Sequence, residues 1–197
     1  MSRGGGNRSD RFARWSRAIL LGLALLLSPA ALPLAQGEAQ LAAEYRVKAA
    51  FVYKFGEYIE WPSDAFTHSG NSIEIGVIGA DMLADELERL VSARTINGRR
   101  VTVVKLRHGD PLDGVHVLFV GRSEESTLGK LLLAAKGRAI VTVTESDQAL
   151  SMGSMINFVV DDDKVRFDIA LIPVEQGNIR ISARLLAVAR KVMPKSS

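Results

Sequence analysis

The sequence contains no cysteine and only three histidines among its 197 residues. The missing thiols exclude disulfide cross-links, zinc–thiolate sites and thiol-based redox switching. The histidines are His68, His108 and His116, and no two of them have the spacing of a metal-ligand pair. His116 lies in an apolar run, where a core histidine is more common than a metal ligand. The fold must therefore be held together by apolar packing alone.

The motifs of common catalytic sites are also missing. Gly121-Arg122-Ser123-Glu124 lacks the closing glycine of a nucleophile elbow. Gly76-Val77-Ile78-Gly79 is only a fragment of a phosphate-binding turn, and ordinary strand-to-helix packing is the simpler interpretation. Asp161-Asp162-Asp163 lacks the further oxygen ligands of a calcium loop and is predicted to be a hairpin turn. We therefore predict no enzyme activity, no metal and no cofactor.

The N-terminus has the pattern of a secretory signal peptide. Five arginines precede an uncharged apolar run at residues 18–27. The prediction is a signal peptide over residues 1–35, cleaved near Ala35 or Ala39 and exported by the general secretory route. An uncleaved membrane anchor is the alternative, but Pro29 and Pro33 interrupt the run before it is long enough to span a bilayer.

Removing this segment changes the charge of the chain. The whole sequence has 25 basic and 22 acidic residues, of which residues 1–35 hold five arginines and Asp10. The remainder has 20 basic and 21 acidic residues, a net charge of −1. The basic isoelectric point thus comes from the leader, and nucleic-acid binding is not predicted.

The pattern of apolar residues predicts a single α/β domain over residues 41–193. An aromatic helix over residues 41–61 ends at Pro62. Strands then alternate with helices, and a hairpin and a final helix follow. The expected fold is a three-layer sandwich with a mixed, mainly parallel sheet, a C-terminal β-hairpin and an aromatic N-terminal helix. The predicted strands are 73–78, 101–106, 115–120, 139–143, 154–160, 164–169 and the extended segment 178–181; the predicted helices are 81–93, 124–135 and 183–192, with a short connection at 173–177.

Cations and aromatic residues supply the candidate binding surface. Lys48 and Lys54 lie in the aromatic helix, and Arg180 and Arg184 lie near the last helix. If the two helices pack side by side, these cations line a small anion pocket; the alternative is that they lie at helix edges with their stems over apolar surface. Phe55 and Trp61 are predicted to belong either to the core or to a surface that binds a partner.

Several segments together resemble one protein family. Their order and spacing are similar to those of the YfiR-like family (DUF4154), over about residues 41–193. The segments are Tyr45 to Phe55 running on to Trp61-Pro62, Ile140 to Val143, Met152 to Ile156, Val165 to Ile169, and Ile181 to Leu186.

The resemblance implies a non-catalytic periplasmic regulator. Members of the family are dimers that bind the periplasmic domain of an inner-membrane diguanylate cyclase and hold it inactive. An OmpA-like outer-membrane lipoprotein can sequester the repressor, so that cyclic-di-GMP rises and favours biofilm. Repressor members carry cysteines, which this chain lacks, so their redox control does not carry over. The alternative is a periplasmic sensor that binds an anion or nucleotide through Lys54, Arg180 and Arg184.

Overall fold

The computed structural model describes Met1, residues 32–67 and residues 70–194. The chain divides into two units, Met1–Gln40 and Leu41–Ser197. The signal peptide expected over residues 1–35 falls almost entirely outside the described residues and stays a prediction. Among the helices that are described, none combines the length and the apolar character needed to cross a membrane.

The second unit is built on a central sheet of eight strands. These strands are β2 (Ser72–Ile78), β3 (Thr95–Ile96), β4 (Arg99–Lys105), β5 (Val115–Val120), β6 (Val141–Thr144), β7 (Ile156–Asp161), β8 (Lys164–Ala170) and β10 (Lys191–Met193). Their order across the sheet is β10-β8-β7-β6-β5-β2-β4-β3. The run from β4 to β7 is parallel, as is the β8–β10 pair, whereas β7–β8 and β3–β4 are antiparallel. The mixed, mainly parallel sheet expected from the sequence is thus confirmed.

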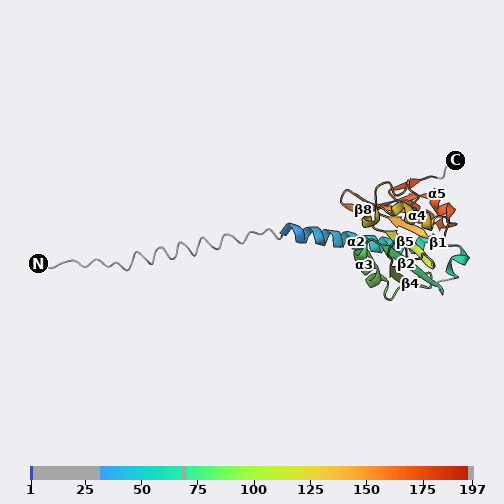
Figure 1. The fold of residues 1–197 in the computed structure, drawn as a ribbon, viewed down its shortest axis with the longest axis horizontal. Coiled ribbons are helices and arrows are strands. Elements are labelled where there is room, and N and C mark those ends of the chain that lie inside the picture. Colours follow the sequence, from blue (N-terminus) through green and yellow to red (C-terminus); the bar gives the residue numbers. More distant parts are fainter. Residues whose placement is uncertain (2–31, 68–69, 195–197) are drawn as a thin grey trace. The chain divides into compact units, whose positions relative to one another are not determined.

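Both faces of the sheet are covered, as the continuous apolar strands predict. In β5, Val117 and Phe119 belong to one core cluster, and Leu118 and Val120 belong to the other. The first cluster includes residues of helices α2 (Leu32–Tyr58), α3 (Asp81–Val91) and α6 (Ala183–Val188), and the second includes residues of helix α4 (Leu128–Ala135). Figure 1 shows α3 beside β2 and β4. These layers confirm the three-layer α/β sandwich.

Phe55 anchors helix α2 to the sheet. Its side chain is completely buried. Its ring centroid lies 4.9 Å from that of Phe167 and 5.8 Å from that of Phe158, on β8 and β7. Phe51 packs on the same rings at 5.5 Å and 6.0 Å. The aromatic residues of this helix are therefore core residues that fix the helix over the β7–β8 hairpin.

Several predicted helix bounds are wrong. Helix α2 begins at Leu32 rather than at residue 41, and it ends at Tyr58 because the chain becomes extended before Pro62 and forms β1 (Ile59–Glu60). The helix expected at 124–135 is a 3-10 turn, η3 (Arg122–Glu124), followed by α4. The short connection expected at 173–177 is helix α5 (Leu171–Gln176), which accommodates Pro173 because a proline in the first turn breaks no helical hydrogen bond.

The helix predicted at 183–192 is also corrected. It stops at Val188, and residues 191–193 form β10 at the edge of the sheet. Arg190 explains this exit, because its Nε and Nη2 atoms donate to the two carboxylate oxygens of Asp168 on β8, at 2.9 and 2.5 Å. The predicted cap is confirmed, since Ser182 Oγ accepts a hydrogen bond from Leu185 N at 3.4 Å.

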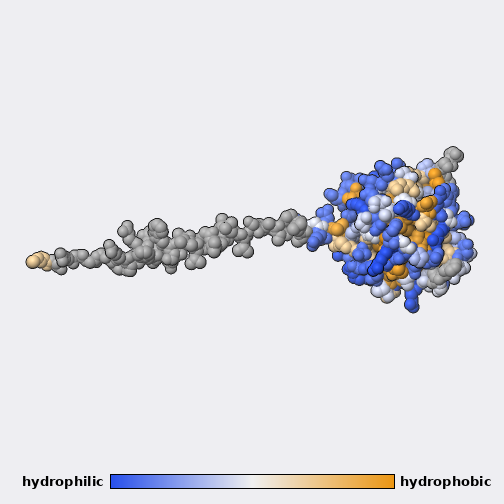
Figure 2. Space-filling view, viewed as in Figure 1, coloured by the Kyte–Doolittle hydropathy of each residue, from blue (hydrophilic) through white to orange (hydrophobic). Residues whose placement is uncertain are grey.

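The predicted hairpin turn at the three aspartates is confirmed. β7 and β8 pair from Asp161 opposite Lys164. Asp162 and Asp163 have φ angles of 48° and 57°, which is the left-handed backbone of a two-residue hairpin turn. All three aspartates are exposed. On the face of the molecule drawn in Figure 2, hydrophilic residues predominate and hydrophobic ones lie between them.

Candidate functional site

The end of helix α2 forms one side of a cleft. After β1, Trp61 leaves the helix direction, and its Nε1 donates to His116 O on β5 at 3.3 Å. Its ring meets those of Phe66 and His116 edge-on, with centroids 6.3 and 6.1 Å apart. Trp61 is therefore held by the domain on one side while its other side remains partly exposed.

Helix α5 and strand β9 (Arg180–Ile181) form the opposite side. β9 pairs antiparallel with β1, with Ile59 opposite Ile181 and Glu60 opposite Arg180. Gly177 ends α5 where the backbones meet closely, because a Cβ atom there would lie 2.8 Å from Arg138 O. A glycine is thus required for β9 to reach the end of the aromatic helix.

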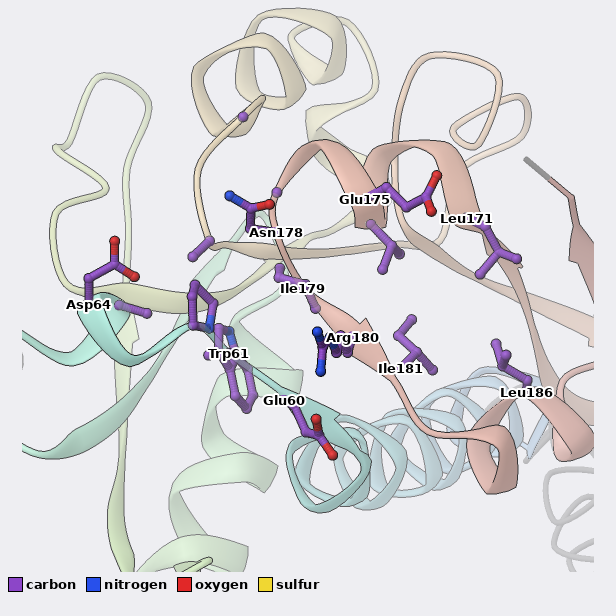
Figure 3. A pocket seen from close by; sticks show the side chains of 16 residues that line it. Glu60, Trp61, Asp64, Leu171, Glu175, Asn178, Ile179, Arg180, Ile181 and Leu186 are labelled. Carbon is purple, nitrogen blue, oxygen red and sulfur yellow. The ribbon is translucent and has the colours of Figure 1, made fainter. Parts of the chain in front are cut away.

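The cleft between these segments has a volume of about 1000 Å³. Figure 3 shows Trp61, Glu60 and Arg180 on one side of it, and Leu171, Ile181 and Leu186 on the other. Its lining combines an apolar floor with polar side chains at the rim. The lining residues are Glu60, Trp61, Pro62, Asp64, Ala65, Gly137, Ala139, Leu171, Val174, Glu175, Gly177, Asn178, Ile179, Arg180, Ile181 and Leu186.

The charges around this cleft are mostly negative. Glu60, Asp64 and Glu175 contribute carboxylates, and Arg180 contributes the one guanidinium among the described lining residues. All four side chains belong to exposed residues. A cationic or mixed-charge partner is therefore favoured over a small anion.

The structure does not bring the two lysines of the aromatic helix together. Lys48 and Lys54 are six residues apart, which is about 9 Å of rise and about 240° of rotation in an α-helix. Lys48 is buried, whereas Lys54 is exposed and forms an ion pair with Glu57 at 2.7 Å. This ion pair raises the pKa of Lys54, so the amine stays charged.

Lys48 belongs to a buried polar network that sequence reasoning missed. Its Nζ donates to Glu145 Oε2 at 2.5 Å and also to Glu44. Glu145 Oε1 accepts from Tyr45 Oη at 3.2 Å and from the Arg122 backbone N at 3.0 Å. Burial, together with the nearby carboxylates of Glu145 and Glu44, raises the pKa of Tyr45 to about 12, so its hydroxyl remains a donor. The network joins helix α2 to the segments that follow β5 and β6.

Of the six candidate surface residues, Trp61 and Arg180 line the same cleft. Lys48 and Phe55 lie in the interior, Lys54 is paired with Glu57, and Arg184 is exposed on α6 outside the lining of the cleft. The carboxylates of the rim were not predicted, because residues 60–64 and 175 meet only through the pairing of β1 with β9.

His116 is a buried core residue, as its place in an apolar strand predicts. Its Nδ1 accepts a hydrogen bond from Glu74 N at 3.2 Å, and its ring stacks on Phe66 with centroids 4.7 Å apart. The Arg99 guanidinium covers the other face of this stack, 3.7 Å from the Phe66 ring centroid. Burial, with a smaller contribution from Arg99, lowers the pKa of His116, so the imidazole is neutral near pH 7.

The glycines after β2 and β5 do not form a phosphate site. A Cβ atom on Gly121 would lie 2.1 Å from Gly79 O, and Ser123 Oγ donates to that same oxygen at 2.9 Å. The two turns therefore touch and leave no space for an anion between them. Within residues 32–67 and 70–194, no three histidine, aspartate or glutamate side chains are placed to hold a metal ion.

One family model matches the chain. Residues 45–190 match the family described as YfiR/HmsC-like (DUF4154). The matched range begins at the tyrosine of the buried network and ends at Arg190, so it contains the sheet up to β8 and the whole cleft.

Proposed function

Because the chain belongs to the YfiR/HmsC-like family over residues 45–190, we propose that it binds the periplasmic domain of an inner-membrane diguanylate cyclase and holds the enzyme inactive. The family indicates a periplasmic regulator of diguanylate cyclase signalling, and its members are regulators rather than enzymes. The specific partner and the repression are the proposed part.

The observation that carries this proposal is the cleft between Trp61 and helix α5. It offers apolar side chains, among them Ile181 and Leu186, inside a charged rim. An apolar centre within a polar rim is the usual anatomy of a protein-binding surface. Trp61 is held by its hydrogen bond to His116 O, so this side of the surface is rigid before a partner arrives.

Repression through this cleft requires differential affinity. The regulator must bind the inactive conformation of the cyclase more tightly than the active one. Shifting a two-state equilibrium from 1:99 to 99:1 takes a preference of about 10⁴-fold. An OmpA-like outer-membrane lipoprotein that occupies the same cleft would relieve repression by competition, and cyclic-di-GMP would rise. We further propose that the regulator is a homodimer.

The test is cyclic-di-GMP synthesis by membranes that contain the cyclase, with and without the purified protein. Leu186→Glu places a carboxylate in the apolar part of the cleft, and Glu60→Lys reverses a charge at its exposed rim. Val188→Glu is the matched control, because Val188 lies on the same helix α6, is 60% exposed and does not line the cleft.

We expect the parent protein and Val188→Glu to inhibit synthesis, and Leu186→Glu to lose inhibition while its circular dichroism is unchanged. Glu60→Lys, which leaves the core untouched, is expected to weaken inhibition as well. Equal inhibition by all four proteins would contradict the place of the cleft in the proposal, and no inhibition by the parent would contradict repression itself.

The small-molecule sensor remains the second candidate, because a volume of about 1000 Å³ is at the upper end of the range for ligand pockets. Arg180 is the cation that an anion or nucleotide would contact there. Calorimetric titration with nucleotides and amino acids distinguishes the two functions. Saturable binding that Arg180→Ala abolishes supports the sensor, and absence of binding together with inhibition of the cyclase supports the repressor.

A further inference from the structure

A second groove lies on the other side of helix α5. Its volume is about 690 Å³, and Leu171 and Gly137 line both this groove and the cleft. Its walls come from α4, the segment before β7, α5 and the end of β10. The lining residues are Gly129, Leu132, Leu133, Ala135, Lys136, Gly137, Thr142, Leu150, Ser151, Met152, Gly153, Met155, Ala170, Leu171, Ile172, Pro173, Gln176, Met193 and Pro194.

The apolar side chains of this groove are unusually exposed. Leu133, Met152 and Ile172 are 71%, 47% and 41% exposed, and all three line it. Gathered apolar exposure of this kind marks interaction sites on soluble proteins. Three methionines contribute to the lining, and flexible thioether side chains adapt to partners of different shape. The groove is thus suited to an apolar segment of another protein.

Charge distinguishes this groove from the cleft. Lys136 is the one ionisable side chain among the described residues that line the groove, whereas the cleft has three carboxylates and one guanidinium. Lys136 is exposed and directly follows the C-terminal end of α4, where a cation is favoured by the helix dipole. An occupant whose own carboxylate meets this ammonium would be favoured.

The same charge argues against a second copy of this chain as the occupant. A two-fold interface centred on the groove would bring Lys136 towards the Lys136 of the other copy, and no carboxylate of the lining is present to separate them. Like charges placed together across an interface oppose association.

We propose that this groove is a second docking surface, which binds an apolar segment of a partner protein that carries a carboxylate beside its apolar side chains. This inference goes beyond the proposed function, because it requires neither a cyclase nor the cleft. The two surfaces select segments of opposite charge on the two sides of α5.

The test is selection of displayed 12-residue random peptides on the purified protein, followed by fluorescence anisotropy with the selected peptides. Leu133→Asp and Lys136→Glu change exposed groove residues, and Val188→Asp is the matched control outside the groove. We expect selected peptides to combine apolar residues with Asp or Glu. Each groove variant is expected to weaken their binding by about tenfold or more, with no change for the control.

A charge swap makes the test specific to Lys136. A selected peptide whose acidic residue is replaced by lysine is expected to bind Lys136→Glu more tightly than it binds the parent protein. The proposal is overturned if no peptide binds, if binding ignores both groove variants, or if the lysine peptide binds the parent equally well. It is also overturned if sedimentation shows that the parent self-associates and Leu133→Asp does not, since the occupant is then a second copy.

Discussion

Replacing Lys48 with methionine is expected to destabilise the fold by leaving a charge buried without its counterion. The side chains of Lys48 and Glu145 are 2% and 1% exposed, and Nζ lies 2.5 Å from Oε2. Methionine preserves the unbranched shape of lysine and removes the ammonium. The Glu145 carboxylate then stays in the interior, where an unpaired charge is costly.

The magnitude follows from what remains around the carboxylate. Breaking a buried ion pair from one side costs about 3–5 kcal/mol. Tyr45 Oη and the Arg122 backbone N still donate to Glu145, so we expect a loss of about 3 kcal/mol, at the lower end of that range. In the double variant Lys48→Met/Glu145→Gln no charge is left buried, and the stability is expected to return to within about 1 kcal/mol of the parent.

Urea unfolding followed by circular dichroism measures these free energies, and the four proteins form a double-mutant cycle. Lys54→Met is the matched control, because it makes the same substitution in the same helix at an exposed ion pair; it is expected to be indistinguishable from the parent. A loss below about 1 kcal/mol for Lys48→Met would refute the reasoning. A double variant as unstable as the sum of the two single variants would refute it as well.

Two further predictions concern the core. Phe55→Ala removes a fully buried ring packed on two others and is expected to cost about 3–5 kcal/mol in urea unfolding, whereas Val188→Ala at a 60% exposed position is expected to change little; a loss below about 1 kcal/mol for Phe55→Ala would remove this ring from the core account. Burial, aided by Arg99, lowers the pKa of His116 in the folded protein, so the unfolded chain takes up the proton first as the pH falls below about 6.5. The free energy of unfolding should therefore decrease with falling pH, by at most about 1.4 kcal/mol per unit for this group; His116→Asn should reduce that slope and His108→Asn should not, and an identical slope in both variants would contradict the assignment.

The sequence predicts the architecture well because its signals are local. Apolar β-branched runs mark strands such as β5, and the aspartates at 161–163 mark the hairpin turn. Strand β10 was missed because it forms only by pairing with β8, where Arg190 meets Asp168. Helix α5 was missed because Pro173 suggested a loop, although the first turn of a helix accepts proline.

The candidate site was predicted only in part. Trp61 and Arg180 were identified by residue type, and they do line one cleft. The partner of Lys48 was not found, because Glu145 follows β6 and is 97 residues away in the sequence, with no local pattern to reveal it. The acidic rim was likewise hidden, since Glu60 and Glu175 meet only when β1 pairs with β9. Contacts between distant segments decide the charge of the site, and periodicity does not report them.

The central claim is that the cleft between Trp61 and α5 binds the membrane partner. Its most direct test is the affinity of the purified protein for the isolated periplasmic domain of the diguanylate cyclase, measured by calorimetry for the parent, Leu186→Glu and Val188→Glu. The account predicts saturable binding that Leu186→Glu weakens by about tenfold or more and that Val188→Glu leaves unchanged. Equal affinity of Leu186→Glu and the parent would contradict it.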